Sequence, residues 1–181
     1  MRRISLLCII ILVVFMSGCF SPKTIVPLRY TPVPMAKDCT YPTTVVLFSD
    51  ARPDPIAVGR TYDGATLYGD MEVVSWASWA LYEELNERGC KASFKDHFPA
   101  QPHGRVITGR IEQLNLNRSS ITDGQLIMRV LFQVYENDKK ILELKRGVTM
   151  EKTDIPTNDI SKDMLTEGLH DILNSALAEI L

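Results

Sequence analysis

The chain has 181 residues, of which 45% are hydrophobic and 23% are charged. This composition is typical of a globular protein and excludes an intrinsically disordered one, and the length suffices for one domain with its own core. The formal net charge is only −2, so the chain lacks the basic excess that binding to nucleic acid requires, and we expect no nucleic-acid partner.

The first residues follow the order of a secretory signal peptide. Two arginines precede an almost wholly apolar run over 4–15, and a Ser-Gly pair stands immediately before Cys19. The run is shorter than the roughly 20 residues that a membrane-spanning helix needs, so we expect 1–18 to be a signal peptide that is removed. The alternative is an ordinary signal anchor or cleaved signal, with an incidental cysteine.

The sequence around Cys19 resembles the lipobox of bacterial lipoproteins, apart from Met16, where lipoboxes usually carry leucine. The resemblance implies a diacylglycerol on the sulfur of Cys19 and an N-acyl chain on its new amino group. Two or three acyl chains, at roughly 0.8 kcal/mol per buried CH2, hold a protein at a membrane almost permanently. Phe20 and Ser21 follow in place of the aspartate that resembles an inner-membrane retention signal, so the predicted location is the periplasmic face of the outer membrane.

Residues 19–42 are predicted to be a lipidated tether that leads into a periplasmic α/β domain over 43–181. Five prolines between 21 and 42 and little periodicity are typical of an extended, partly polyproline-II chain. The run over 43–49 is β-branched and apolar, which predicts a buried strand. Residues 50–69 contain several glycines, prolines and aspartates without an apolar period, so we expect a long loop there.

A helix is predicted from Asp70, which would cap it, to about Arg88, with Gly89 ending it. Its apolar positions, among them Trp76, recur at helical spacing and form the core-facing stripe, and its glutamates lie off this stripe. Trp79 lies at the margin of the stripe. Packing in the core is the favoured interpretation of Trp79, and contact between a partly exposed indole and a partner is the alternative.

Cys39 and Cys90 remain after signal removal and lipidation, and a cysteine pair in an oxidising compartment indicates a disulfide more often than a site. Cys39 precedes the strand over 43–49, and Cys90 precedes a second, weaker strand over 91–95. If these strands are parallel neighbours joined by the helix, both cysteines lie at the same end of the sheet, within bonding distance. The alternative is two buried free thiols.

Three further strands and a helix complete the domain. The strand over 105–116 changes phase partway, as a β-bulge would make it do. Strands over 125–135 and 140–150 alternate and are joined by a polar turn, which predicts an antiparallel hairpin. From about Asp159 the apolar residues recur with a helical period. We therefore expect an α+β fold, an α/β two-layer sandwich in which two amphipathic helices cover one face of a mixed sheet of about five strands.

The sequence contains no motif of a known enzyme chemistry, such as a nucleophile elbow, a P-loop, a zinc-protease helix or a Cys-x-x-Cys pair. His97 and His103 share one loop without further ligands at a fixed spacing, and His170 falls on the polar face of the last helix. A metal site needs more ligands than these. We therefore expect no enzyme activity, no metal and no cofactor other than the acyl chains on Cys19.

The loop over 50–69 is the predicted contact surface, because loops on a rigid scaffold carry function disproportionately. Asp50, Arg52 and Asp54 in this loop, together with Trp79, are the residues predicted to meet a partner. As a carboxylate cluster, the loop aspartates have no base or metal beside them, so turn formation explains them better. A hydrolase acting on envelope polymers has only this acidic loop in its favour.

The mature sequence is similar to the YajG-type family of small outer-membrane lipoproteins. The similarity is carried by Cys19, by VVLFSDARPDPIAVG over 45–59, by VVSWASWALYEELNERG over 73–89, by VITGRIEQL and by the closing helix. It implies location and fold, and it supplies no catalytic residues. We expect a non-enzymatic lipoprotein whose domain binds another envelope component. The strand and helix order also resembles auxiliary lipoproteins of ABC-type lipid transport systems, which implies the alternative of binding a lipid or a small apolar ligand.

Overall fold

The structure, a computed structural model, describes residues 23–34, 39, 41–102, 104–153 and 160–181. The predicted signal peptide and Cys19 lie outside the described residues. Within them the chain forms an α+β domain with two helices and a nine-stranded mixed sheet. The elements are β1 (Thr24–Val26), β2 (Pro42–Val46), β3 (Ser49–Asp50), β4 (Ala57–Arg60), β5 (Thr66–Gly69), α2 (Val73–Glu87), β6 (Lys91–Lys95), β7 (Arg105–Arg118), β8 (Asp123–Glu136), β9 (Lys139–Thr153) and α3 (Ile160–Ile180).

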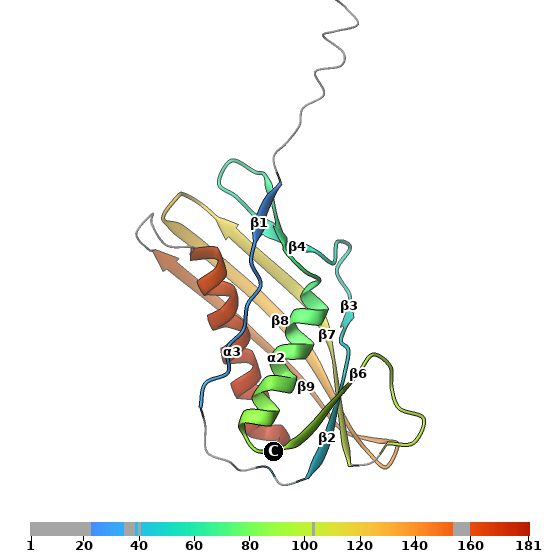
Figure 1. Cartoon of the computed structure of the whole chain (residues 1–181). Helices are drawn as coiled ribbons and strands as arrows, with labels where there is room; N and C mark the ends of the chain where they lie inside the picture. The colour runs from blue at the N-terminus through green and yellow to red at the C-terminus, as the bar shows by residue number, and fades with distance from the viewer. Residues whose placement is uncertain (1–22, 35–38, 40, 103, 154–159) are drawn as a thin grey trace, which may run out of the picture.

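β7 is the central strand of this sheet (Figure 1). One edge of β7 pairs antiparallel with β8 from end to end, and β8 pairs antiparallel with β9. The other edge pairs in succession with β2, β3 and β4, all in parallel. Beyond them, β6 extends the sheet from β2, whereas β5 and β1 extend it from β4. The predicted α+β class is confirmed, and the sheet is larger than the five strands expected.

The additional strands lie largely in the stretch over 50–69, where the prediction of a long loop is wrong. β3, β4 and β5 are two to four residues long, which is too short to show a period in sequence. β3 and β4 form because the long edge of β7 offers hydrogen-bond partners, and β5 pairs with β4 in turn. The amide of Ala51, for example, donates to the carbonyl of Ile111 over 2.9 Å. Glycine is required at Gly59, because a Cβ there would lie 1.9 Å from the carbonyl oxygen of Leu116.

The stretch predicted as a tether contributes to the packed domain. β1 pairs in parallel with β5, and Val26 and Leu28 are buried. The chain then passes over both helices, since the carbonyl of Arg29 accepts hydrogen bonds from the indole of Trp76 on α2 and the hydroxyl of Thr166 on α3. The domain therefore begins well before residue 43, because the backbone groups of this segment are hydrogen-bonded to the sheet and the helices, and its apolar side chains are buried against them.

The predicted disulfide between Cys39 and Cys90 is confirmed, with the two Cα atoms 4.7 Å apart. Its geometry is the one expected from the order of elements. β2 and β6 are parallel neighbours joined by α2, with Pro42 opposite Lys91, so the cysteines before them lie at one end of the sheet.

One end of α2 agrees with the prediction from sequence and the other does not. Its end at Gly89 is confirmed, because this residue has a φ of 84°, which glycine adopts without steric cost. The cap predicted at Asp70 is wrong. Glu72 precedes the first turn without a side-chain cap, and the carboxylate of Asp70 instead accepts the amide of Leu28 and pairs with Arg29 at 2.8 Å. Asp70 thus fixes the N-terminal segment rather than the helix.

The long strands follow the predicted pattern. The register of β7 against β8 shifts between Ile111 and Gln113, which is the predicted bulge. The turn between β8 and β9 has Asn137 and Asp138 at φ of 50° and 63°, the left-handed pair typical of a tight hairpin.

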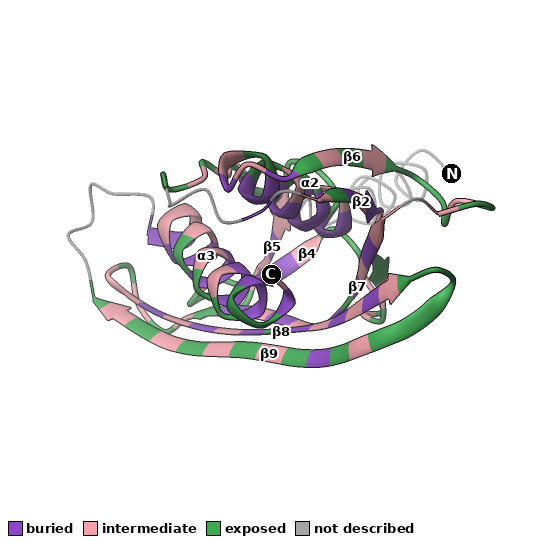
Figure 2. Ribbon diagram, turned by 90° about the horizontal axis from the view of Figure 1, so that it is seen from below, coloured by how far each residue is buried: buried purple, intermediate pink, exposed green. Residues whose placement is uncertain are grey.

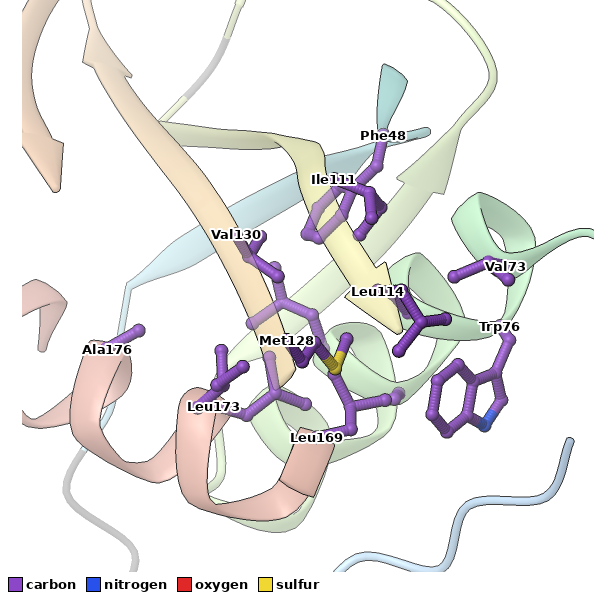
Figure 3. Close-up of a cluster of buried hydrophobic side chains, with 14 of the residues drawn as sticks. Phe48, Val73, Trp76, Ile111, Leu114, Met128, Val130, Leu169, Leu173 and Ala176 are labelled. Carbon is purple, nitrogen blue, oxygen red and sulfur yellow. The ribbon is translucent and has the colours of Figure 1, made fainter. Parts of the chain in front are cut away.

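Both helices lie on the concave side of the curved sheet (Figure 2). α3 packs over β8 and β9, and α2 packs over β2, β6 and β7. Between them lies one hydrophobic core, where Met128 and Val130 of β8 face Leu169 and Leu173 of α3 (Figure 3). Each such aliphatic side chain contributes roughly 1.5–3 kcal/mol by burial, so this interface holds α3 on the sheet. Neither helix among the described residues has the length and apolar character needed to cross a bilayer.

Candidate functional site

Asp50 and Arg52, predicted to meet a partner, bind each other. The guanidinium donates to both carboxylate oxygens of Asp50 at 2.9 and 2.7 Å, and their side chains are only 11% and 7% exposed. Arg52 also donates to the carbonyls of Pro55 and Ala57 at 2.8 and 2.6 Å. Because its donors are used within the loop, this bidentate pair shapes the connection between β3 and β4.

The other aspartates of this stretch also form turns. Asp54 accepts the backbone amides two and three residues further on, both at 3.2 Å. Asp63 accepts the hydroxyl of Thr61 and the amide of Ala65, and the hydrogen bond from Thr61 is the main reason why the pKa of Asp63 is lowered. The interpretation of these carboxylates as turn-forming residues is confirmed. The shallow, open depression of about 390 Å³ beside Arg52 and Asp54 also contains Glu112, so charges of both signs border it.

Trp79 differs from its favoured interpretation as a core residue, because its side chain is 48% exposed. Its ring stacks on Phe94 of β6, with centroids 4.5 Å apart and planes 8° from parallel. Tyr82, one turn further along α2, meets the ring of Trp79 edge-on at 5.3 Å. These three residues, here called the aromatic cluster, present a rigid and partly exposed apolar surface.

A small open depression of about 170 Å³ lies between the aromatic cluster and the N-terminal segment. Leu28, Met71, Trp76 and Trp79 line it, together with the charged residues Arg29 and Glu83. Met71 is itself 41% exposed. The cluster and this depression together form a continuous, mostly apolar surface, which is the arrangement that protein interfaces use around aromatic anchors.

Sequence reasoning did not include Tyr82 and Phe94 in this surface. Tyr82 follows Trp79 by three residues, a spacing that places both on one side of a helix. Phe94 belongs to a different element, and nothing in its local sequence indicates that β6 lies beside α2 at this height. The pairing of Trp79 with Tyr82 could therefore be predicted from the sequence, whereas the stacking of Trp79 on Phe94 could not.

A second group of interest is a buried charged cluster between the helices. Glu84, expected away from the apolar stripe, is fully buried, and it accepts the phenol of Tyr30 at 2.5 Å. The guanidinium of Arg88 lies 3.9 Å from the Glu84 carboxylate and donates to Asn174 of α3 at 2.9 Å. His170 of α3 lies 4.0 Å from Glu84. The cluster thus joins the N-terminal segment, α2 and α3 through one carboxylate.

Tyr30 gives this cluster a measurable pH dependence. Burial, and then the hydrogen bond to Glu84, raise the pKa of Tyr30 far above its usual value. The folded state therefore favours the neutral phenol, and the resulting stabilisation is fully present below pH ~10, where the unfolded tyrosine ionises, and is lost above it. In denaturant titrations from pH 8 to 11.5, we expect the wild type to lose up to about 1.4 kcal/mol more per pH unit above pH ~10 than Tyr30→Phe does. Parallel profiles for the two proteins would contradict this assignment.

The histidines form no metal centre in the described part of the chain, where no group of three or more potential ligands is present. His97 lies in the connection between β6 and β7, and His103 lies outside the described residues. His170 is partly buried and stacks against Tyr30, with ring centroids 6.4 Å apart. Its place in the charged cluster gives His170 a packing role.

No protein-family model and no curated protein matches this chain. Its fold is similar to that of solved structures. One is protein XCC0632 from Xanthomonas campestris, with the family description DUF330, at a TM-score of 0.61, 9% identity and coverage of 87% of this chain and 95% of that one. Another is an uncharacterised protein, at a TM-score of 0.56, 12% identity and coverage of 88% and 100%. A third is a PelC dodecamer from Paraburkholderia phytofirmans, at a TM-score of 0.47, 14% identity and coverage of 79% of this chain and 90% of that one. At these identities, the first two similarities show that the chain shares its α+β fold with these two proteins.

Proposed function

We propose that this protein is a lipid-anchored lipoprotein of the bacterial envelope. Acyl chains on Cys19 hold its domain at the periplasmic face of the outer membrane, as in the YajG-type family that its sequence resembles. The domain is a binding module without enzyme activity, and its partner is another envelope protein. The aromatic cluster, not the loop over 50–69, is the contact surface.

The observation that carries the binding role is the exposed stack of Trp79 on Phe94. Tryptophan and tyrosine are the residues most often found as energetic anchors in interfaces, and this pair is already rigid, so little side-chain entropy is lost when a partner binds. By contrast, Asp50 and Arg52 are occupied by each other and by their own loop. If Arg52 gave up its present contacts to bind a partner, four hydrogen bonds would break.

The alternative of a lipid or apolar-ligand carrier needs a concave apolar pocket. The depressions found among the described residues beside α2 and beside β4 are open to solvent, and the one beside β4 is bordered by charged groups. Two further depressions, of about 330 Å³ beside the start of α3 and about 440 Å³ beside the start of β8, are lined largely by polar and charged residues. These linings favour a protein partner over a small apolar ligand.

The test of partner binding is site-specific photocrosslinking in intact cells, with a photoreactive amino acid in place of Trp79. We expect a discrete crosslinked species in the membrane fraction, which mass spectrometry identifies as an envelope protein. Ile141 at the start of β9 is the matched control, because it is 51% exposed and belongs to a strand that lies across the domain from α2 and β6 (Figure 2). Equal crosslinking from both positions, or none from either, would argue against the aromatic cluster as a specific surface.

The test of anchoring is metabolic labelling with palmitate. We expect label on the wild-type protein, and a Cys19→Ser variant that is unlabelled and no longer sediments with the outer membrane. A labelled Cys19→Ser variant, or an unlabelled wild type recovered from the cytosol, would contradict the anchor.

A further inference from the structure

The strand registers bring several distant segments to one end of the sheet. β4 and β7 run in parallel and end together, with Arg60 opposite Asn117. β5 and β8 run antiparallel to them and begin at the same end, and β1 begins beside β5. Lys23, the β4–β5 turn over 61–65 and the β7–β8 turn over 119–122 therefore lie together, at what is here called the anchor end (Figure 1).

The anchor end has an unusual surface. The three most exposed large hydrophobic residues of the described chain all lie there: Ile25 at 62%, Tyr62 at 58% and Ile121 at 55%. Each comes from a different segment, since Ile25 is in β1, Tyr62 is in the β4–β5 turn and Ile121 is in the β7–β8 turn. With three such side chains at one end of the sheet, this end is the candidate for contact with an apolar environment.

Covalent geometry limits what this surface can meet. Cys19 precedes Lys23 by four residues, so the two Cα atoms are at most about 14 Å apart. The 14 residues of β8 extend about 45 Å from the anchor end to the opposite end of the sheet. A lipid on Cys19 therefore keeps the anchor end within reach of the bilayer surface, whatever the tilt of the domain.

We propose that the anchor end contacts the lipid bilayer directly, with Tyr62 and Ile121 at the depth of the headgroups. This inference rests on the proposed lipidation of Cys19. Tyrosine favours the membrane–water interface, because its ring is apolar and its hydroxyl stays hydrated. Lys23 and Arg60 are exposed at the same end and bring positive charge towards anionic headgroups.

Two acidic residues at the anchor end, Asp63 and Asp123, accept hydrogen bonds from neighbouring hydroxyls. Asp63 accepts the hydroxyl of Thr61, and Asp123 accepts the hydroxyls of Ser120 and Thr153 at 2.5 and 2.7 Å. Their charges offset part of the positive charge nearby. The apolar side chains, rather than net charge, therefore provide the contact.

The experiment uses the full lipoprotein, reconstituted into vesicles of phosphatidylethanolamine and phosphatidylglycerol that carry bromine on their acyl chains. Bromine quenches tryptophan at short range. The fluorescence that Tyr62→Trp or Ile121→Trp adds is measured as the difference between the variant and the wild type. We expect this difference to fall at least twofold when the acyl chains carry bromine. The matched control Ile141→Trp has a similar exposure, 51%, but lies towards the opposite end of β8 and β9, and we expect no quenching of it.

Two further measurements separate the possible outcomes. In hydrogen exchange on the wild type, vesicles should protect 61–65 and 119–122 but not the β8–β9 turn. If the protein fails to float with the vesicles, both the anchor and this inference are overturned. If it floats but neither new tryptophan is quenched and neither turn is protected, only the inference is overturned. If the fluorescence at these two sites changes with protein concentration and not with lipid, the surface contacts a second copy of the chain. That result would also overturn the inference.

Discussion

Replacement of Glu84 with glutamine is expected to lower the free energy of unfolding by about 3–5 kcal/mol, because it breaks a buried pair in which the carboxylate lies 3.9 Å from the guanidinium of Arg88. The Glu84 side chain is 0% exposed and that of Arg88 is 5% exposed. Glutamine keeps the size of the side chain and an acceptor for the phenol of Tyr30, so the change isolates the charge. Denaturant unfolding, with its slope compared between variants, provides the measurement.

The neighbouring Glu83→Gln substitution is the matched control, since Glu83 is exposed on the same turn of α2. We expect it to change stability by less than about 0.5 kcal/mol. In the double variant Glu84→Gln with Arg88→Met, the loss should be smaller than the sum of the losses of the two single variants, because both substitutions break the same buried pair. If Glu84→Gln is no more destabilising than Glu83→Gln, the buried pair does not hold the helices together as described.

Removal of the disulfide is the second change with a large expected effect. The bond joins residues 51 apart, and closing a loop of that length restricts the unfolded chain by about 4 kcal/mol at 25 °C in the chain-entropy model. We expect Cys39→Ser with Cys90→Ser to lose about this much stability. Wild type unfolded in the presence of a reductant should show a similar loss, since both experiments free the same loop.

The disulfide also has a positional consequence. The amide of Cys39 also donates to the carbonyl of Arg88 at the end of α2, over 3.3 Å. The disulfide therefore fixes the N-terminal segment at the place where this segment meets the buried charged cluster. Hydrogen exchange in the double serine variant should therefore rise first in 27–34 and in the last turn of α2. A loss below about 1 kcal/mol, with unchanged exchange there, would mean that packing alone holds this segment.

The two proposed surfaces belong to different parts of the domain. The anchor end is formed by β1 and by the turns beside it, whereas the aromatic cluster lies on α2 and β6. A bilayer at the first surface would leave the second accessible to a protein in the periplasm. Under the two proposals, attachment and recognition therefore use separate surfaces.

The sequence by itself determined the elements whose information is local. α2, β6 to β9 and α3 are visible because their apolar residues repeat with the period of a helix or a strand over five residues or more. The bulge in β7 appears as a change of phase, and the hairpin turn as polar residues that accept positive φ. The disulfide followed from these elements, because the βαβ order places both cysteines before parallel strands.

Only the tertiary structure decided the features that depend on meetings between distant segments. β1 and β3 to β5 are too short to carry a period; β3 and β4 exist because the edge of β7 supplies hydrogen bonds, and β5 and β1 add to β4 in turn. Glu84 is buried because Tyr30, Arg88 and α3 surround it, which no helical periodicity predicts. Trp79 remains exposed because β6 offers it only the flat ring of Phe94. In each case the physical reason is the same: burial and pairing are properties of the neighbours that a residue acquires on folding.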